Sequence, residues 1–156
     1  MYRKILVPLD GSQLSESVIP HVLTVAKGCE DCEIVLFRVC EPPVLLADYP
    51  EHLKTKWEEH VREETAHIAQ QCRLYLTDSE QQFKKAGLRV TSSSGLGNPA
   101  EAIIDYAEAN EVDLIVIASH GHSGATRWAY GNTASKVLQA SQVPVLIVKP
   151  GKKSGQ

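Results

Sequence analysis

Three short polar segments have the residue types and the spacing to bind an anionic ligand. Ser119-His120-Gly121 follows the apolar run 114–118, and Gly131-Asn132-Thr133 comes after nine further residues. Small residues between a strand and a helix expose backbone N–H groups, which is where α/β proteins bind phosphate. Asp10-Gly11-Ser12 ends another apolar run, and the Asp10 carboxylate suits a ribose hydroxyl or a divalent cation. The alternative role for Asp10 is to cap the turn into the next helix.

Predicted strands and helices alternate along the chain and position these segments. The strands are predicted over residues 5–9, 33–39, 88–93, 114–118 and 143–148. Four helices are predicted. An apolar stripe indicates the first, over residues 18–26, and the second extends over residues 51–86 and ends before Gly87. The third begins at Asn98-Pro99 and ends at about Asn110, and the fourth extends from Gly131 to Ala140. Continuous apolar strands between helices are typical of a parallel sheet covered on both faces. We therefore predict an α/β fold with one doubly wound, five-stranded sheet.

Size and charge limit the classes of partner. The 156 residues fit one domain over residues 1–150, followed by a short polar tail over residues 151–156. A net charge of −3 provides no basic surface for nucleic acid, and no apolar run approaches the roughly 20 residues of a membrane span. The first residues enter a strand at once, which leaves no room for a secretory signal. We expect a cytoplasmic protein with reduced thiols and with neither nucleic acid nor membrane as a partner.

Two patterns suggest catalysis or dinucleotide binding, and both fail on their context. Gly95-Leu96-Gly97 begins a match to the dinucleotide fingerprint, but it does not lie at the first strand-to-helix turn, so a capped helix start is favoured. Ser119 beside His120 lacks the G-x-S-x-G sequence of a nucleophile elbow. No catalytic residue is predicted.

Cysteine and histidine residues raise the question of a metal or redox site. Cys29-Glu30-Asp31-Cys32 has C-x2-C spacing, but no second ligand pair stands at zinc-ribbon spacing, so a structural role is favoured over redox or metal chemistry. His52, His60 and His67 could share one face of the long predicted helix, where a solvated role is favoured over metal binding. No dedicated metal site is predicted.

Four segments in register resemble the universal stress protein family. They are Ile5–Ser12, Gly97–Ile103, Asp113–Gly121 and Val143–Lys149. The resemblance extends over nearly the whole chain, and it implies the strand order 3-2-1-4-5 and a homodimer, expected through the last strand, Val143 to Val148. One branch of the family binds ATP, and another lacks bound nucleotide and acts through dimers and partner contacts. Both branches remain open as functions of this chain.

The nucleotide-binding branch carries the pattern G-x2-G-x9-G-[ST]. Here the pattern falls on Ala118, Gly121, Gly131 and Asn132, so two of its three glycines and the nine-residue spacing are kept. Ala118 adds one methyl group, which is costly only where the backbone φ is positive. Asn132 keeps an amide donor, and Thr133 supplies a hydroxyl one position later.

By position, the resemblance also implies a nucleotide site. Asp10 would accept from the ribose, Val39 would contact adenine through its backbone, and His122 and Arg127 are equally compatible with ligand contact and with a solvated loop. The implied nucleotide-binding residues are Pro8, Leu9, Asp10, Val39, Ile117, Ala118, Gly121, His122, Arg127, Gly131, Asn132 and Thr133. The implied ligand is ATP, with ADP or AMP as alternatives, together with Mg2+ held through the nucleotide. The implied function is regulation of a stress response with slow ATP hydrolysis at most.

Overall fold

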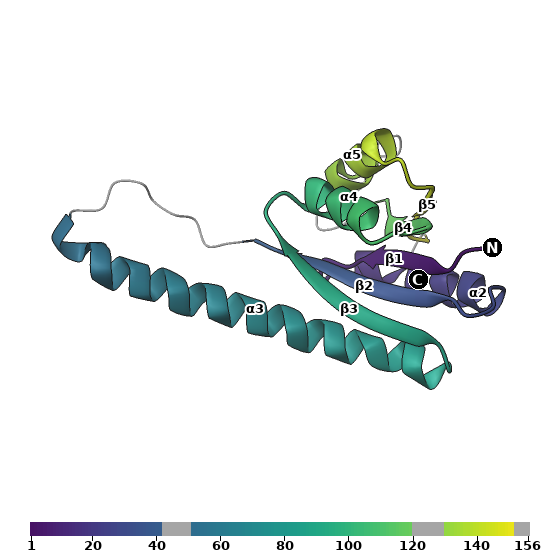
Figure 1. The fold of residues 1–156 in the computed structure, drawn as a ribbon, viewed down its shortest axis with the longest axis horizontal. Coiled ribbons are helices and arrows are strands. Elements are labelled where there is room, and N and C mark those ends of the chain that lie inside the picture. The colour runs from purple at the N-terminus through teal and green to yellow at the C-terminus, as the bar shows by residue number, and fades with distance from the viewer. Residues whose placement is uncertain (42–50, 120–129, 152–156) are drawn as a thin grey trace, which may run out of the picture.

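A twisted sheet of five parallel strands organises the chain in this computed structural model, which describes residues 1–41, 51–119 and 130–151 (Figure 1). The strands are β1 (Lys4–Pro8), β2 (Glu33–Cys40), β3 (Arg89–Leu96), β4 (Leu114–Ala118) and β5 (Val145–Val148). Their order is β3-β2-β1-β4-β5, and every neighbouring pair is parallel. The predicted fold class and strand order are therefore confirmed.

Helices cover both faces of the sheet. They are α1 (Gln13–Glu16), α2 (Ile19–Lys27), α3 (Lys54–Lys85) after a short 3-10 turn η1 (Glu51–Leu53), α4 (Pro99–Ala109) and α5 (Asn132–Ala140). One buried cluster joins the sheet to α2 and α3, and a second joins the opposite face to α4 and α5 (Figure 1). Along β1, Ile5 and Val7 belong to the first cluster and Leu6 to the second. Because successive side chains enter opposite cores, the central strands have the continuous apolar sequence typical of a parallel sheet.

The helix predicted from the apolar stripe is preceded by a short helix that the sequence did not predict. The single stripe expected over residues 18–26 forms α2, and a separate one-turn helix, α1, precedes it. Pro20 lies in the first positions of α2, where its missing N–H removes no helical hydrogen bond. Ser12 caps α1, because its Oγ accepts from the Ser15 N–H at 3.1 Å. Local hydrogen bonding, not hydrophobic periodicity, therefore sets this junction.

Two other boundaries differ from the prediction. β3 continues to Leu96, so Gly95 lies inside a strand rather than in a turn. β5 begins at Val145, and the preceding Pro144 contributes only its carbonyl, which accepts from the Ile115 N–H at 2.9 Å.

The predicted start of α4 is confirmed, because Asn98 Oδ1 accepts from the backbone N–H groups of Ala100 and Glu101 at 3.1 and 3.3 Å.

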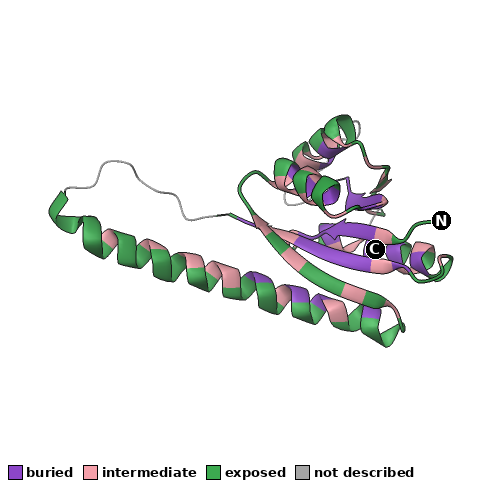
Figure 2. Cartoon of the chain, viewed as in Figure 1, coloured by how far each residue is buried: buried purple, intermediate pink, exposed green. Residues whose placement is uncertain are grey.

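The long helix α3 is buried only along its second half. Its buried residues are Cys72, Leu76, Ser79 and Phe83. At 32 residues it is about 48 Å long, whereas the eight-residue strands β2 and β3 extend about 26 Å, so its first half continues past the sheet (Figure 2). His52 of η1 and His60 and His67 of α3 are all exposed. Among the helices of the described part of the chain, none is both long and apolar enough to cross a membrane.

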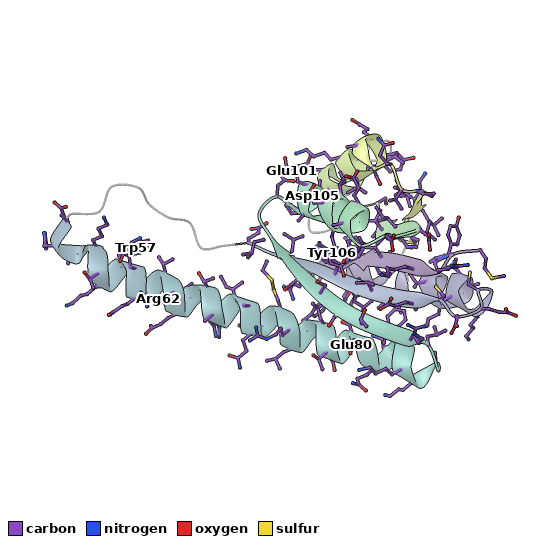
Figure 3. The ribbon with its side chains drawn as sticks, in the orientation of Figure 1. Trp57, Arg62, Glu80, Glu101, Asp105 and Tyr106 are labelled. Atoms are coloured by element: carbon purple, nitrogen blue, oxygen red, sulfur yellow. A yellow bond between two sulfur atoms is a disulfide. The ribbon has the colours of Figure 1, made fainter. Side chains whose placement is uncertain are left out.

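The expectation of reduced thiols is contradicted for one cysteine pair. Cys40, the last residue of β2, is joined by a disulfide to Cys72 of α3, with the two Cα atoms 6.7 Å apart (Figure 3). The sequence pattern drew attention to Cys29 and Cys32, which are both free, and burial raises the pKa of the Cys32 thiol to about 11. The pairing was missed because it depends on where α3 lies across β2, which no local spacing reveals.

Asp113 is expected to stabilise the start of the sheet in a pH-dependent way. Its Oδ2 accepts from the backbone N–H groups of Arg3 at 2.7 Å and Lys4 at 2.9 Å, and these bonds lower the pKa of the carboxyl. A lowered folded-state pKa contributes stability above the ordinary value of about 3.9, and that contribution is lost as the pH falls through the folded-state pKa. Asp113→Asn should lower the free energy of unfolding by about 1 kcal/mol at pH 7, a modest value because the carboxylate is partly exposed.

Urea unfolding of both proteins between pH 7 and pH 2 measures this effect. The difference between Asp113→Asn and the parent protein should shrink toward zero at the acid end. A difference that stayed constant across the range would assign the effect to packing rather than to the charge of the carboxylate.

Candidate functional site

A cavity of about 280 Å³ opens at the carboxyl ends of β1 and β4, where the strand order reverses. Five parts of the chain line it: the β1–α1 turn, the end of β2, the start of α4, the end of β4 and the start of α5. The lining residues are Pro8, Leu9, Asp10, Ser15, Phe37, Val39, Pro99, Ile103, Ile117, Ala118, Ser119, Gly131, Asn132, Thr133 and Ala134. Ligands of doubly wound proteins bind at this position of the sheet.

The structure brings together every predicted site residue that it describes. Pro8, Leu9, Asp10, Val39, Ile117, Ala118, Gly131, Asn132 and Thr133 all line the cavity. Gly121, His122 and Arg127 lie outside the described residues. Segments from the two ends of the chain therefore meet in one cavity, as their positions at the ends of neighbouring strands predict.

The β1–α1 turn is held by its own side chains. Asp10 Oδ1 accepts from the Ser12 N–H at 2.8 Å, and the Asp10 N–H donates to Ser15 Oγ at 3.3 Å. Gly11 has φ +87°, and a Cβ there would lie 3.2 Å from Arg38 Nη2. This φ favours glycine, and a side chain here would also press on the guanidinium. Asp10 thus has the capping role that the sequence allowed, and the same turn places it at the cavity wall.

A half-buried network supports this turn from the other side of the sheet. The Arg38 guanidinium carbon lies 4.7 Å from the centre of the Tyr75 ring, and the Tyr75 hydroxyl donates to Glu16 Oε1 at 2.8 Å. Burial, together with the Glu16 hydrogen bond, raises the pKa of Tyr75 to about 12. The phenol therefore stays protonated at neutral pH and keeps its donor role, which links α3 to α1.

The first turn of α5 lines the cavity. Gly131 is the N-cap and makes no side-chain capping bond, while its own N–H donates to the Ser119 carbonyl. Asn132 and Thr133 are the first two helical residues. The leading N–H groups of a helix lack intrahelical acceptors and lie at its positive end. This end of the cavity is therefore suited to an anion.

The opposite end of the cavity is apolar. Phe37, Val39, Pro99 and Ile103 form it, and the Phe37 ring packs on Tyr106 of α4 with 4.7 Å between ring centres. Tyr106 is on the side of α4 that faces the sheet (Figure 3). An apolar chamber beside an N–H-rich helix end can hold a ligand with a flat ring and an anionic group.

The sequence interpretation missed five lining residues: Ser15, Phe37, Pro99, Ile103 and Ala134. Two of them carried a usable signal. Phe37 lies two positions before Val39, so strand periodicity places both on the same face, and Ile103 lies four positions after Pro99 on one helix face. The contribution of Ser15 could not be read in this way because it depends on the short α1 helix.

Two features bear on what the cavity can do chemically. Among the described lining residues, Asp10 alone has an ionisable side chain. Positive φ angles at residues other than glycine occur, within the described part of the chain, at Asp31 and Glu111 and not at Ala118. The alanine that replaces the first pattern glycine therefore carries no backbone strain. The site can bind and orient a ligand, but a second acid–base group is absent from the described lining.

The fold is that of a doubly wound α/β protein with a cavity at the switch point of its sheet. A profile of the universal stress protein family matches residues 1–149. The chain belongs to the universal stress protein family.

Relatives of similar size are found in archaea and bacteria. Universal stress protein MJ0531 of Methanocaldococcus jannaschii is 28% identical over 153 residues, covering 98% of this chain and 85% of that protein. Universal stress protein YxiE of Bacillus subtilis is 28% identical over 156 residues, covering 96% of this chain and all of that protein. The solved structure of MJ0577, from the same archaeon as MJ0531, superposes with a TM-score of 0.82 at 27% identity, covering 98% of this chain and 99% of that one.

Two more distant structures share the fold and contain nucleotides. A universal stress protein in complex with cAMP has a TM-score of 0.61 at 19% identity, over 95% of this chain and 97% of that one. A universal stress protein family protein of Arabidopsis thaliana with AMP bound has a TM-score of 0.63 at 15% identity, over 99% of this chain and 95% of that one.

Proposed function

We propose that this protein binds an adenine nucleotide in the cavity and acts as a regulatory protein of the stress response, with slow hydrolysis at most. The observation that carries the proposal is the division of one cavity into two chemically different ends. The apolar end near Phe37 and Val39 suits a base, and the start of α5 suits phosphate groups. Asp10 lies on the cavity wall between β1 and α1 and would accept from the ribose.

ATP is the proposed ligand, with ADP and AMP as the alternatives. The nucleotides named for two distant members of the fold, cAMP and AMP, support the adenine class. A divalent cation would enter with the phosphates. One carboxylate, already accepting from the Ser12 N–H, does not form a metal site by itself.

Addition of ATP and Mg2+ is expected to stabilise the protein. A ligand that binds only the folded state adds about 2.7 kcal/mol at a hundred times its dissociation constant. For a domain of this size the midpoint of thermal unfolding should then rise by about 5–10 °C. A fluorescence thermal melt over a series of ATP concentrations measures the shift, with inorganic tripolyphosphate as the control for phosphate binding alone. A midpoint that does not move with ATP concentration would contradict the proposal.

The alternative function is a dimeric interaction module without bound nucleotide. Ala118 and Asn132, which depart from the nucleotide-binding pattern, are its motivation. Two observations weaken this argument against nucleotide binding: Ala118 does not have a positive φ, and Thr133 lies on the cavity wall. Mass spectrometry of small molecules released from the denatured protein separates the two functions, because a co-purified adenine nucleotide excludes the nucleotide-free branch.

A homodimer through the last strand is proposed in either case. β5 is an edge strand, and Leu146 at its centre is 38% exposed, whereas Val145 packs against the core cluster of α4 and α5. Edge strands with exposed apolar residues tend to pair with another chain.

Leu146→Lys is therefore expected to weaken the dimer. Near a two-fold axis each lysine would lie close to its own copy, and like charges across strands are destabilising. Sedimentation velocity should show a shift toward monomer at equal concentration. Leu74→Lys is the matched control, since Leu74 is 63% exposed on α3, away from β5. If Leu146→Lys and Leu74→Lys sediment alike as dimers, the interface lies elsewhere.

A further inference from the structure

The backbone conformation at Gly95 does not require glycine. This residue lies in β3, paired with Val39 of β2, and the positive-φ glycines of the described chain are Gly11, Gly87 and Gly97. The reason for glycine here is packing: a Cβ at position 95 would lie 2.8 Å from Phe37 Cζ and 3.6 Å from Phe37 Cε1. Carbon atoms without a bond between them are most stable about 3.5–4.0 Å apart. Any side chain here therefore requires the Phe37 ring or the β3 backbone to move.

The Phe37 ring has little freedom to move away from such a group. It is 2% exposed, and the Tyr106 ring lies against it at 4.7 Å between centres. Ala102 of α4 also packs close to this position, since its Cβ would be 3.4 Å from the Cβ added at Gly95. Phe37 also lines the cavity, which offers open space beside the ring. A ring displaced from Gly95 would therefore enter the apolar end of the cavity.

We propose that Gly95 is a specificity-determining position that keeps the apolar end of the cavity wide enough for a purine base. It does so through Phe37, because Gly95 itself does not line the cavity, and it is therefore a positioning residue. The inference rests on the proposed function and adds the residue that keeps room for the base. Binding of the two-ring base depends on the position of the Phe37 ring. Binding of the phosphate groups does not, because they would lie at the N-terminus of α5.

The test compares ATP with inorganic tripolyphosphate in Gly95→Ala. The affinity for Mg2+-ATP, measured by isothermal titration calorimetry, should fall by at least about tenfold, and the affinity for tripolyphosphate should change by less than about twofold. Ser94→Ala is the matched control in the same strand, because Ser94 pairs with Arg38 and its side chain points to the opposite face of the sheet. It should leave both affinities unchanged.

A second substitution distinguishes a positioning role from general damage to the fold. Phe37→Leu removes the ring atoms that the added Cβ would meet, so Gly95→Ala placed in the Phe37→Leu protein should change ATP affinity by less than about threefold. This comparison holds even if Gly95→Ala alone folds poorly.

Three results would overturn the inference. The first is unchanged ATP affinity in Gly95→Ala, which an outward shift of edge strand β3 would produce. The second is an equal loss of affinity for ATP and for tripolyphosphate in Gly95→Ala, and the third is a loss of ATP affinity that is just as large when Gly95→Ala is placed in the Phe37→Leu protein. A parent protein that binds no ATP would instead contradict the proposed function itself, and the specificity role with it.

Discussion

Replacing Thr133 by glutamate is expected to weaken ATP binding by at least about a hundredfold without destabilising the fold. Thr133 is the second residue of α5 and lines the cavity at its anionic end. A carboxylate there would lie close to the phosphate groups, and unit charges 4 Å apart near a protein surface repel by about 4 kcal/mol. The same carboxylate interacts favourably with the positive end of α5, whose first turn has no acidic residue, by about 0.3–1 kcal/mol.

Opposite changes in binding and stability make this substitution informative. Calorimetric titration with Mg2+-ATP gives the affinity, and a thermal melt without nucleotide gives the stability. Thr133→Gln is the control, since it has a similar size and no charge, and it should lose far less affinity. Equal binding by the glutamate and glutamine variants would place the phosphates away from α5.

Reduction of the Cys40–Cys72 disulfide is expected to lower the free energy of unfolding by about 3–4 kcal/mol. The two cysteines are separated by 32 positions, and releasing a loop of that length restores the corresponding chain entropy to the unfolded state. The bond joins the end of β2 to the start of the buried half of α3, so its loss removes a covalent restraint between helix and sheet. Urea unfolding with and without a reductant measures the effect.

Two variants complete the disulfide experiment. The double variant Cys40→Ala, Cys72→Ala should show no response to the reductant, while Cys29→Ala should keep the full response because Cys29 is free. Parent protein whose stability is the same with and without the reductant would show that the bond contributes nothing to folding.

Much of the candidate site could be predicted because its residues sit at strand ends. The runs before Asp10 and Ser119 are central strands, and parallel strands bring their carboxyl ends to one edge of the sheet. The helix starts at Pro99 and Gly131 were readable from residue types alone. The exception was α1, because it lies before the apolar stripe and depends on the hydrogen bonds of Ser12 and Ser15 rather than on apolar periodicity.

The sequence by itself determined the strands, the helices and the class of the sheet, because apolar periodicity and helix caps depend on residues a few positions apart. Only the tertiary structure decided which distant side chains form the walls of the site. Val39 lies opposite Gly95 because of the β2–β3 register, and that register brings Phe37 against the missing side chain. The pairing of Cys40 with Cys72 likewise depends on the packing of α3 against β2. Registers and helix packing are set by the fit of whole surfaces, which no local pattern contains.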